Sequence, residues 1–101
     1  MQQESIEKLV SLELKSAEAK FPKHNSAHES YAVLREEYDE TMIEMEYITE
    51  EIECLWAHVK KNDTKQIGVS IDELKETSIK LIEEAIQFSA MCDRFKKDIL
   101  S

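Results

Sequence analysis

Two short acidic motifs contain the residue types in this sequence that are best suited to chemistry. The first motif reads E-E-x-x-E and consists of Glu36, Glu37 and Glu40. The second reads E-E-x-x-Q and consists of Glu83, Glu84 and Gln87. Because residues three apart project from one side of a helix, each motif would present two oxygen ligands together on a helix. Ligands that are all oxygen favour Mg²⁺, Mn²⁺ or Ca²⁺ over zinc.

The apolar residues around the motifs predict two long helices, over residues 26–60 and 71–99. In each segment, side chains repeat every seven residues in two largely apolar rows, named a and d as in a heptad. In the first segment, row a is Tyr31, Tyr38, Met45, Ile52 and Val59, and row d is Ala27, Leu34, Thr41, Ile48 and Leu55. In the second, row a is Ile71, Ser78, Ala85, Cys92 and Ile99, and row d is Leu74, Leu81, Phe88 and Phe95.

Both motifs have the same phase in this frame. Glu37 and Glu84 fall at position g, and Glu40 and Gln87 fall at position c, so all four border row d. If the two helices pack antiparallel, these side chains converge. Two like charges 4 Å apart cost about 4 kcal/mol at an effective dielectric of 20, and a divalent cation turns that repulsion into coordination. The alternative is a solvated acidic face without metal, because 22 of the residues are acidic.

The remaining segments predict a first helix and one long loop. Apolar residues recur at helical spacing over residues 5–21, with Ser5 as a candidate N-cap and Pro22 as the stop. Residues 62–69 contain the sole Gly and are predicted to form a loop. The sequence Ser70-Ile71-Asp72-Glu73 is a capping box that would start the third helix.

Composition favours a single all-α domain over residues 1–101. One Gly and one Pro are too few for most β folds, and one Gly cannot build a Gly-rich phosphate loop. The net charge of −9 disfavours nucleic-acid binding. Cys54 and Cys92 form no disulfide framework, and we expect reduced, half-buried thiols in a cytoplasmic protein. We expect no signal peptide, and no apolar run approaches the ~20 residues that span a membrane.

The long helices predict an oligomer. A helix of about 35 residues is about 52 Å long, and a short first helix with one partner cannot bury it. We therefore expect a homodimer or a homotetramer that completes a helical bundle. The alternative is a monomeric three-helix bundle.

Two blocks of the sequence carry a family resemblance. Residues 25–40 and residues 84–91, together with Arg94 and Phe95, resemble the MazG-like all-α nucleoside triphosphate pyrophosphohydrolases of small phage and prophage type. The resemblance implies a site built by helices of neighbouring subunits. It also implies that Mg²⁺ (or Mn²⁺) promotes hydrolysis of a nucleoside triphosphate to the monophosphate and pyrophosphate. It gives Glu37, Glu40, Glu84 and Gln87 the role of metal ligands. It makes Glu36 a further ligand, or the residue that positions or deprotonates water.

Three further residues are candidates for substrate binding. Lys80 and Arg94 share position c with Gln87, and cations there would contact phosphate. His28, in the first turn of its helix, would contact substrate or relay a proton. The alternative for all three is an ordinary structural or surface role.

The second motif departs from the family pattern. Gln87 stands where the family has an acid, and an amide oxygen ligates Mg²⁺ without adding charge. The distance between the two motifs is also longer than in typical members. A non-catalytic helical interaction or regulatory protein is therefore the alternative to the enzyme.

Overall fold

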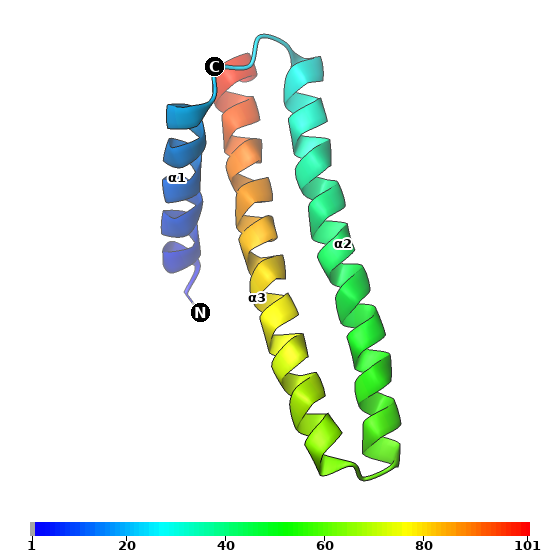
Figure 1. Ribbon diagram of the computed structural model, residues 1–101. Helices are drawn as coiled ribbons and strands as arrows, with labels where there is room; N and C mark the ends of the chain where they lie inside the picture. The colour runs from blue at the N-terminus through cyan, green and yellow to red at the C-terminus, as the bar shows by residue number, and fades with distance from the viewer. Residues whose placement is uncertain (1) are drawn as a thin grey trace.

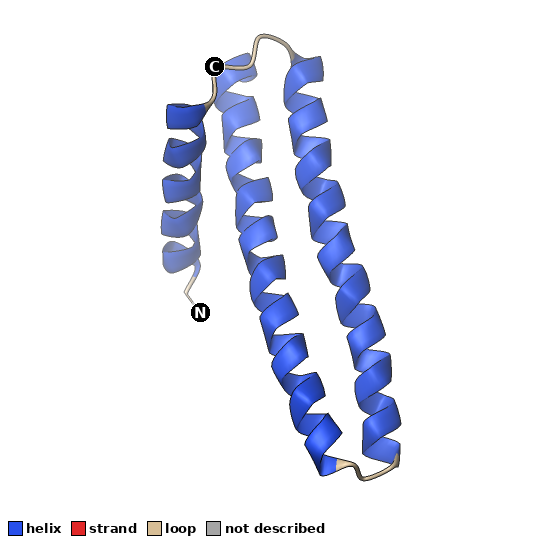
Figure 2. Cartoon of the chain, viewed as in Figure 1, coloured by secondary structure: helices blue, strands red, loops and turns tan. Residues whose placement is uncertain are grey.

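The computed structural model describes residues 2–101, and it contains helices only. They are α1 (Gln3–Lys20), α2 (Ala27–Lys60) and α3 (Thr64–Phe95), followed by one π-helical turn, η1 (Lys96–Leu100) (Figure 2). No strand occurs in these residues, which confirms the all-α prediction. None of these helices combines the length and the apolarity that a membrane crossing requires.

The helices form an elongated hairpin with a short third member. α2 and α3 run antiparallel, and α1 lies along only the C-terminal half of α3 (Figure 1). The principal extents of the chain are 56 × 27 × 20 Å. As a result the hairpin has three helices at one end, here called the proximal end, and only two at the other, the distal end.

The distal turn is much shorter than predicted. The predicted loop over residues 62–69 is wrong, because α3 begins at Thr64 and Gly68 lies within the helix. Asp63 caps the helix by accepting a hydrogen bond from the Gln66 amide at 3.2 Å. The capping-box sequence at residues 70–73 is therefore helix interior. One Gly costs a helix about 1 kcal/mol, which long-range packing and a good cap offset.

The start of α1 also differs from the prediction, whereas the start of α2 agrees with it. α1 begins at Gln3, so Ser5 lies in the first turn and is not the N-cap. Ser26 caps α2, and its side chain accepts a hydrogen bond from the Glu29 amide at 3.1 Å. The predicted end of α1 at Pro22 agrees with the structure to within two residues.

A buried network holds the connector between α1 and α2 against the end of α3. Arg94 is 3% exposed and donates hydrogen bonds to the carbonyls of Phe21 and Pro22. Its Nε lies 3.5 Å from Asp98 Oδ2, which also accepts the backbone N–H of His24 at 3.0 Å. This network fixes where α2 begins relative to α3.

The apolar core is small and lies at the proximal end. Its buried members are Val10, Ala17, Ala90 and Met91. Row d of α2 and α3 is mostly half-buried along the hairpin, but row a of α2 is exposed at every position. Cys54 and Cys92 are both free and exposed, so the prediction of half-buried thiols is wrong.

Candidate metal centre

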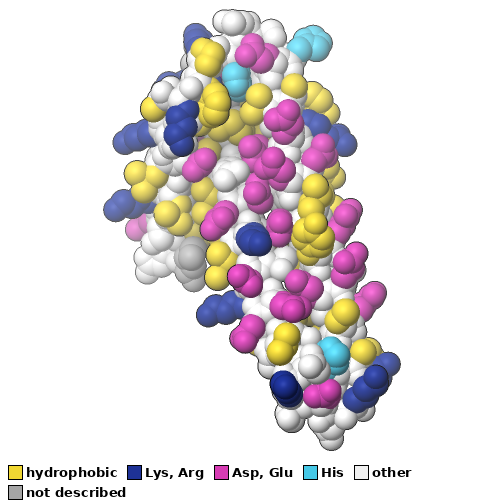
Figure 3. Space-filling model, viewed as in Figure 1, with side chains coloured by type: hydrophobic (Ala, Val, Ile, Leu, Met, Phe, Trp, Pro, Cys, Tyr) yellow, Lys and Arg dark blue, Asp and Glu magenta, His cyan; other side chains and the backbone are white. Residues whose placement is uncertain are grey.

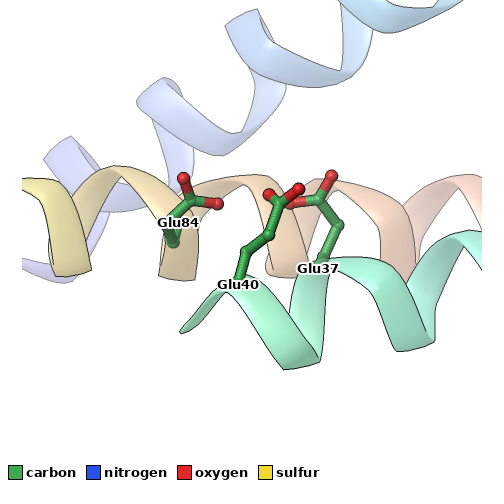
Figure 4. A group of neighbouring side chains, drawn as sticks. All are labelled: Glu37, Glu40 and Glu84. Carbon is green, nitrogen blue, oxygen red and sulfur yellow. The ribbon is translucent and has the colours of Figure 1, made fainter. Parts of the chain in front are cut away.

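Three carboxylates from two helices of one chain converge on the polar side of the hairpin. Glu37 and Glu40 lie one turn apart on α2, and the antiparallel course of α3 brings Glu84 opposite them (Figure 4). One carboxylate oxygen from each lies within 4.8 Å of the other two. These three carboxylates all come from one chain, and the implied contribution of neighbouring subunits stays a prediction.

Gln87 belongs to the same cluster. With the amide oriented to satisfy its neighbours, its nitrogen donates to Glu37 Oε2 at 3.1 Å and to Glu84 Oε2 at 3.2 Å. The amide thus bridges carboxylates of α2 and α3. A reversal of the amide about its last torsion would turn the oxygen toward the same point, so Gln87 can serve as either a donor or a ligand.

Two carboxyl groups of the cluster, those of Glu37 and Glu84, have raised pKa values. Burial raises the pKa of Glu84 to about 7, with further contributions from its hydrogen bond to Glu40 and from the charges of Glu40, Glu37 and Glu44. Burial also raises the pKa of Glu37, and so do the charges of Glu40, Glu13 and Glu36. The ion pairs found in residues 2–101 include none of the three clustered carboxylates.

The arrangement therefore favours the uptake of positive charge. The space-filling view shows acidic side chains gathered along this side of the hairpin (Figure 3). A proton satisfies one carboxyl at most, whereas a divalent cation neutralises two charges and accepts several oxygen ligands. All four side chains at the centre offer oxygen, so they fit Mg²⁺ or Mn²⁺.

A cavity of about 370 Å³ adjoins the cluster, because Glu37 and Gln87 line both. It lies where α1, the connector, α2 and α3 meet. Its apolar wall includes Ala17, Phe21, Val33 and Met91. Its acidic rim includes Glu13, Glu29, Glu36 and Glu37.

Some of the other candidate residues from the sequence line this cavity, and the others do not. Glu36 is exposed and lines it, and Arg94 lines it while donating to the connector carbonyls. His28 and Lys80 are exposed and are not among its lining residues. Glu83 is exposed on α3. The substrate-binding roles of His28, Lys80 and Arg94 stay predictions, and so does the catalytic role of Glu36.

Two residues at the site were missed by the sequence reasoning. Glu13 of α1 lines the cavity and is close enough to raise the pKa of Glu37. His24 is buried in the connector, where its Nδ1 and Ser30 Oγ lie 2.7 Å apart. The helical spacing of Val10 and Ala17 places Glu13 beside the buried stripe of α1, but no local pattern shows that α1 docks next to Glu37.

No known protein family, curated protein or solved structure matches this chain. The MazG-like family therefore stays a prediction from the two motifs and the residues around them.

Proposed function

We propose that Glu37, Glu40 and Glu84 bind a divalent cation, Mg²⁺ or Mn²⁺, with Gln87 as a fourth ligand. The observation that carries the proposal is the convergence, within 4.8 Å, of three carboxylates that have no ion-pair partner in residues 2–101. The raised pKa of Glu84 supports it, because burial and the neighbouring carboxylates both disfavour its uncompensated negative charge, which a cation would offset. Hard oxygen ligands select these ions over zinc.

We propose further that the protein is a cytoplasmic nucleoside triphosphate pyrophosphohydrolase. A bound Mg²⁺ would neutralise charge on the phosphates and make water a better nucleophile. Glu36, next to Glu37 and at the cavity rim, would position the attacking water or accept its proton. The products would be the nucleoside monophosphate and pyrophosphate, as the motif resemblance implies.

The cavity beside the cluster supports a nucleoside triphosphate as the substrate. A ligand whose phosphates meet the carboxylate-bound cation has its remaining part within reach of Phe21, Val33 and Met91. Arg94 lines this space and positions the connector, so it acts on the substrate through the shape of the cavity. His28 and Lys80 lie outside the lining and receive less support.

A non-catalytic helical interaction or regulatory protein is the second candidate, and the geometry of Gln87 favours it. Its amide already donates to two of the three carboxylates, which stabilises the cluster without metal. In that case the acidic side would serve solubility or bind a basic partner.

Pyrophosphate release from a panel of nucleoside triphosphates in Mg²⁺ distinguishes the candidates. We expect release by the wild type, a loss of about 100-fold or more in Glu37→Gln, and little change in Glu46→Gln. Glu46 is the matched control because it lies on the same helix and is exposed. No release from any triphosphate, or equal rates for the wild type and Glu37→Gln, would favour the non-catalytic protein.

A further inference from the structure

The α2–α3 hairpin turns its polar rows inward and leaves an apolar row outside. Row g consists of Ser30, Glu37, Glu44, Glu51 and His58 on α2, and of Ser70, Thr77, Glu84, Met91 and Asp98 on α3 and η1. Every member of row g is buried or half-buried. Row a of α2, with two tyrosines, a methionine, an isoleucine and a valine, is exposed throughout. Burial of apolar surface drives folding and association, so we expect this exposed row to pack against another surface.

We propose that a second copy of this chain covers row a, forming a symmetric dimer of hairpins. In this dimer a twofold axis runs along the hairpins, so that α2 of each copy lies over α3 of the other. The result is a four-helix bundle in which neighbouring helices are antiparallel. The proposal does not depend on the metal site, which lies on the opposite, acidic side of the hairpin.

The exposed area of the chain has the size that a dimer requires. The accessible surface is 7539 Å², whereas a compact monomer of 11.8 kDa exposes about 5,900 Å². The excess is about 1,600 Å² per chain. Stable homodimer interfaces bury about 1,000–2,500 Å² per partner. The radius of gyration, 17.6 Å, also exceeds the ~13 Å of a compact chain of this length.

The heptad register makes the face complementary to itself. Within the chain, Ala27 and Phe95 border one surface depression, and Leu34 and Phe88 border another, so the two d rows run against each other in reverse order. In the dimer, the same reverse order places row a of α2 in one copy against row a of α3 in the other copy. The matched residues are Tyr31 with Cys92, Tyr38 with Ala85, Met45 with Ser78 and Ile52 with Ile71. In the first three matches a large side chain of α2 meets a small one of α3, and in the fourth two isoleucines meet.

The charge of the face also suits a second copy. The chain has 22 acidic residues and a net charge of −9, yet rows a and e of α2 and α3 contain no Asp or Glu. Row e instead includes Arg35 and Trp56 on α2 and Lys75 and Ile82 on α3. Two chains that repel each other elsewhere can therefore approach on this face without placing like carboxylates together.

Sedimentation velocity over a range of concentrations tests the proposal with a matched pair of variants. Tyr38, 44% exposed, lies in row a, and Tyr47, 51% exposed, lies at position c on the opposite side of α2. We expect the wild type to have twice the chain mass. We expect Tyr38→Glu to raise the dimer dissociation constant by about 100-fold or more, and Tyr47→Glu to leave it unchanged. A wild type that is monomeric up to about 100 μM, or equal effects of the two variants, would overturn the proposal.

Disulfide trapping tests the register of the dimer. This test remains valid even if the Tyr38→Glu variant does not fold. In a background of Cys54→Ala and Cys92→Ala, we introduce Met45→Cys together with Ser78→Cys. Oxidation should join residue 45 of one copy to residue 78 of the other. A disulfide between the two residues 45 would place α2 over α2 and overturn the arrangement. Failure to form any dimeric disulfide would also overturn it.

Discussion

The two ends of the hairpin are built differently, although the same two helices form both. At the proximal end, α1 and the connector close the structure, and the four apolar residues that are buried within residues 2–101 lie there. At the distal end only α2 and α3 meet, and the buried side chains are Ser70 and Thr77. The proximal end can therefore fix the acidic cluster and its cavity within one chain. The distal end depends on polar contacts within the chain, and the second copy that we propose would cover row a at both ends.

Removal of Arg94 should have the largest effect, because it breaks the closure of the proximal end. Arg94→Met leaves two connector carbonyls without their donor and the largely buried Asp98 without its cation. We expect a loss of about 3 kcal/mol in the free energy of unfolding, measured by urea denaturation at one protein concentration. Lys97→Gln, which removes the largely exposed ion pair with Glu18, is the control and should cause a much smaller loss. Equal losses in the two variants would contradict the role of Arg94 in closing the proximal end.

Removal of the buried polar contact at the distal end should lower the free energy of unfolding by a smaller amount. Thr77 donates to Glu51 Oε2 at 2.8 Å, and Thr77→Val would leave this half-buried carboxylate without its donor. We expect a loss of about 1–2 kcal/mol, smaller than that for Arg94. Thr64→Val, at an exposed position at the start of α3, is the control. A larger loss from Thr77→Val than from Arg94→Met would reverse the comparison.

The acidic cluster should make the protein more stable at mildly acidic than at alkaline pH. The pKa of Glu84 rises to about 7 in the fold, so the folded state binds a proton more tightly than the unfolded chain does. This contribution is present below the ordinary glutamate pKa and is lost as the pH rises through about 7.

We therefore expect the melting temperature to fall by a few degrees between about pH 5 and pH 8. Asp98, whose pKa is lowered chiefly by the backbone N–H of His24, stays ionised over this range. Glu84→Gln should flatten the profile, whereas Glu83→Gln, at the exposed neighbouring position, should retain it. A steeper fall in Glu84→Gln would contradict the assignment.

Replacement of Gly68 should give the smallest effect, and the change should be stabilising. Gly68 lies inside α3, and a Cβ built there meets nothing within 4 Å. Gly68→Ala should raise the free energy of unfolding by about 0.5–1 kcal/mol, because alanine favours the helix. A destabilisation would show that residues 64–70 are not helical in solution.

The sequence predicted the long helices and the convergence of the motifs because both depend on periodicity. Glu37 and Glu84 share position g, and antiparallel packing of the d rows then brings them together. The position of the distal turn does not follow from the sequence pattern, because Gly68 favours a loop locally, whereas the cap at Asp63 and packing along α3 outweigh one glycine.

Other features could not be predicted because they arise from docking. The heptad pattern shows rows a and d but does not show which neighbouring row, a or g, completes the seam inside the chain. Glu13 and His24 reach the site only because α1 and the connector fold back onto α3. The role of Arg94 in holding the connector depends on the same fold, since its partners lie about seventy residues away.

The central claim, that the carboxylates of α2 and α3 form a metal site, is tested most directly by calorimetric titration of Mn²⁺ and Mg²⁺ at pH 8. We predict saturable binding to the wild type, unchanged binding to Glu83→Gln, and at least a tenfold weaker affinity in Glu84→Gln. Binding that is absent from the wild type, or equal in the two variants, would contradict the claim.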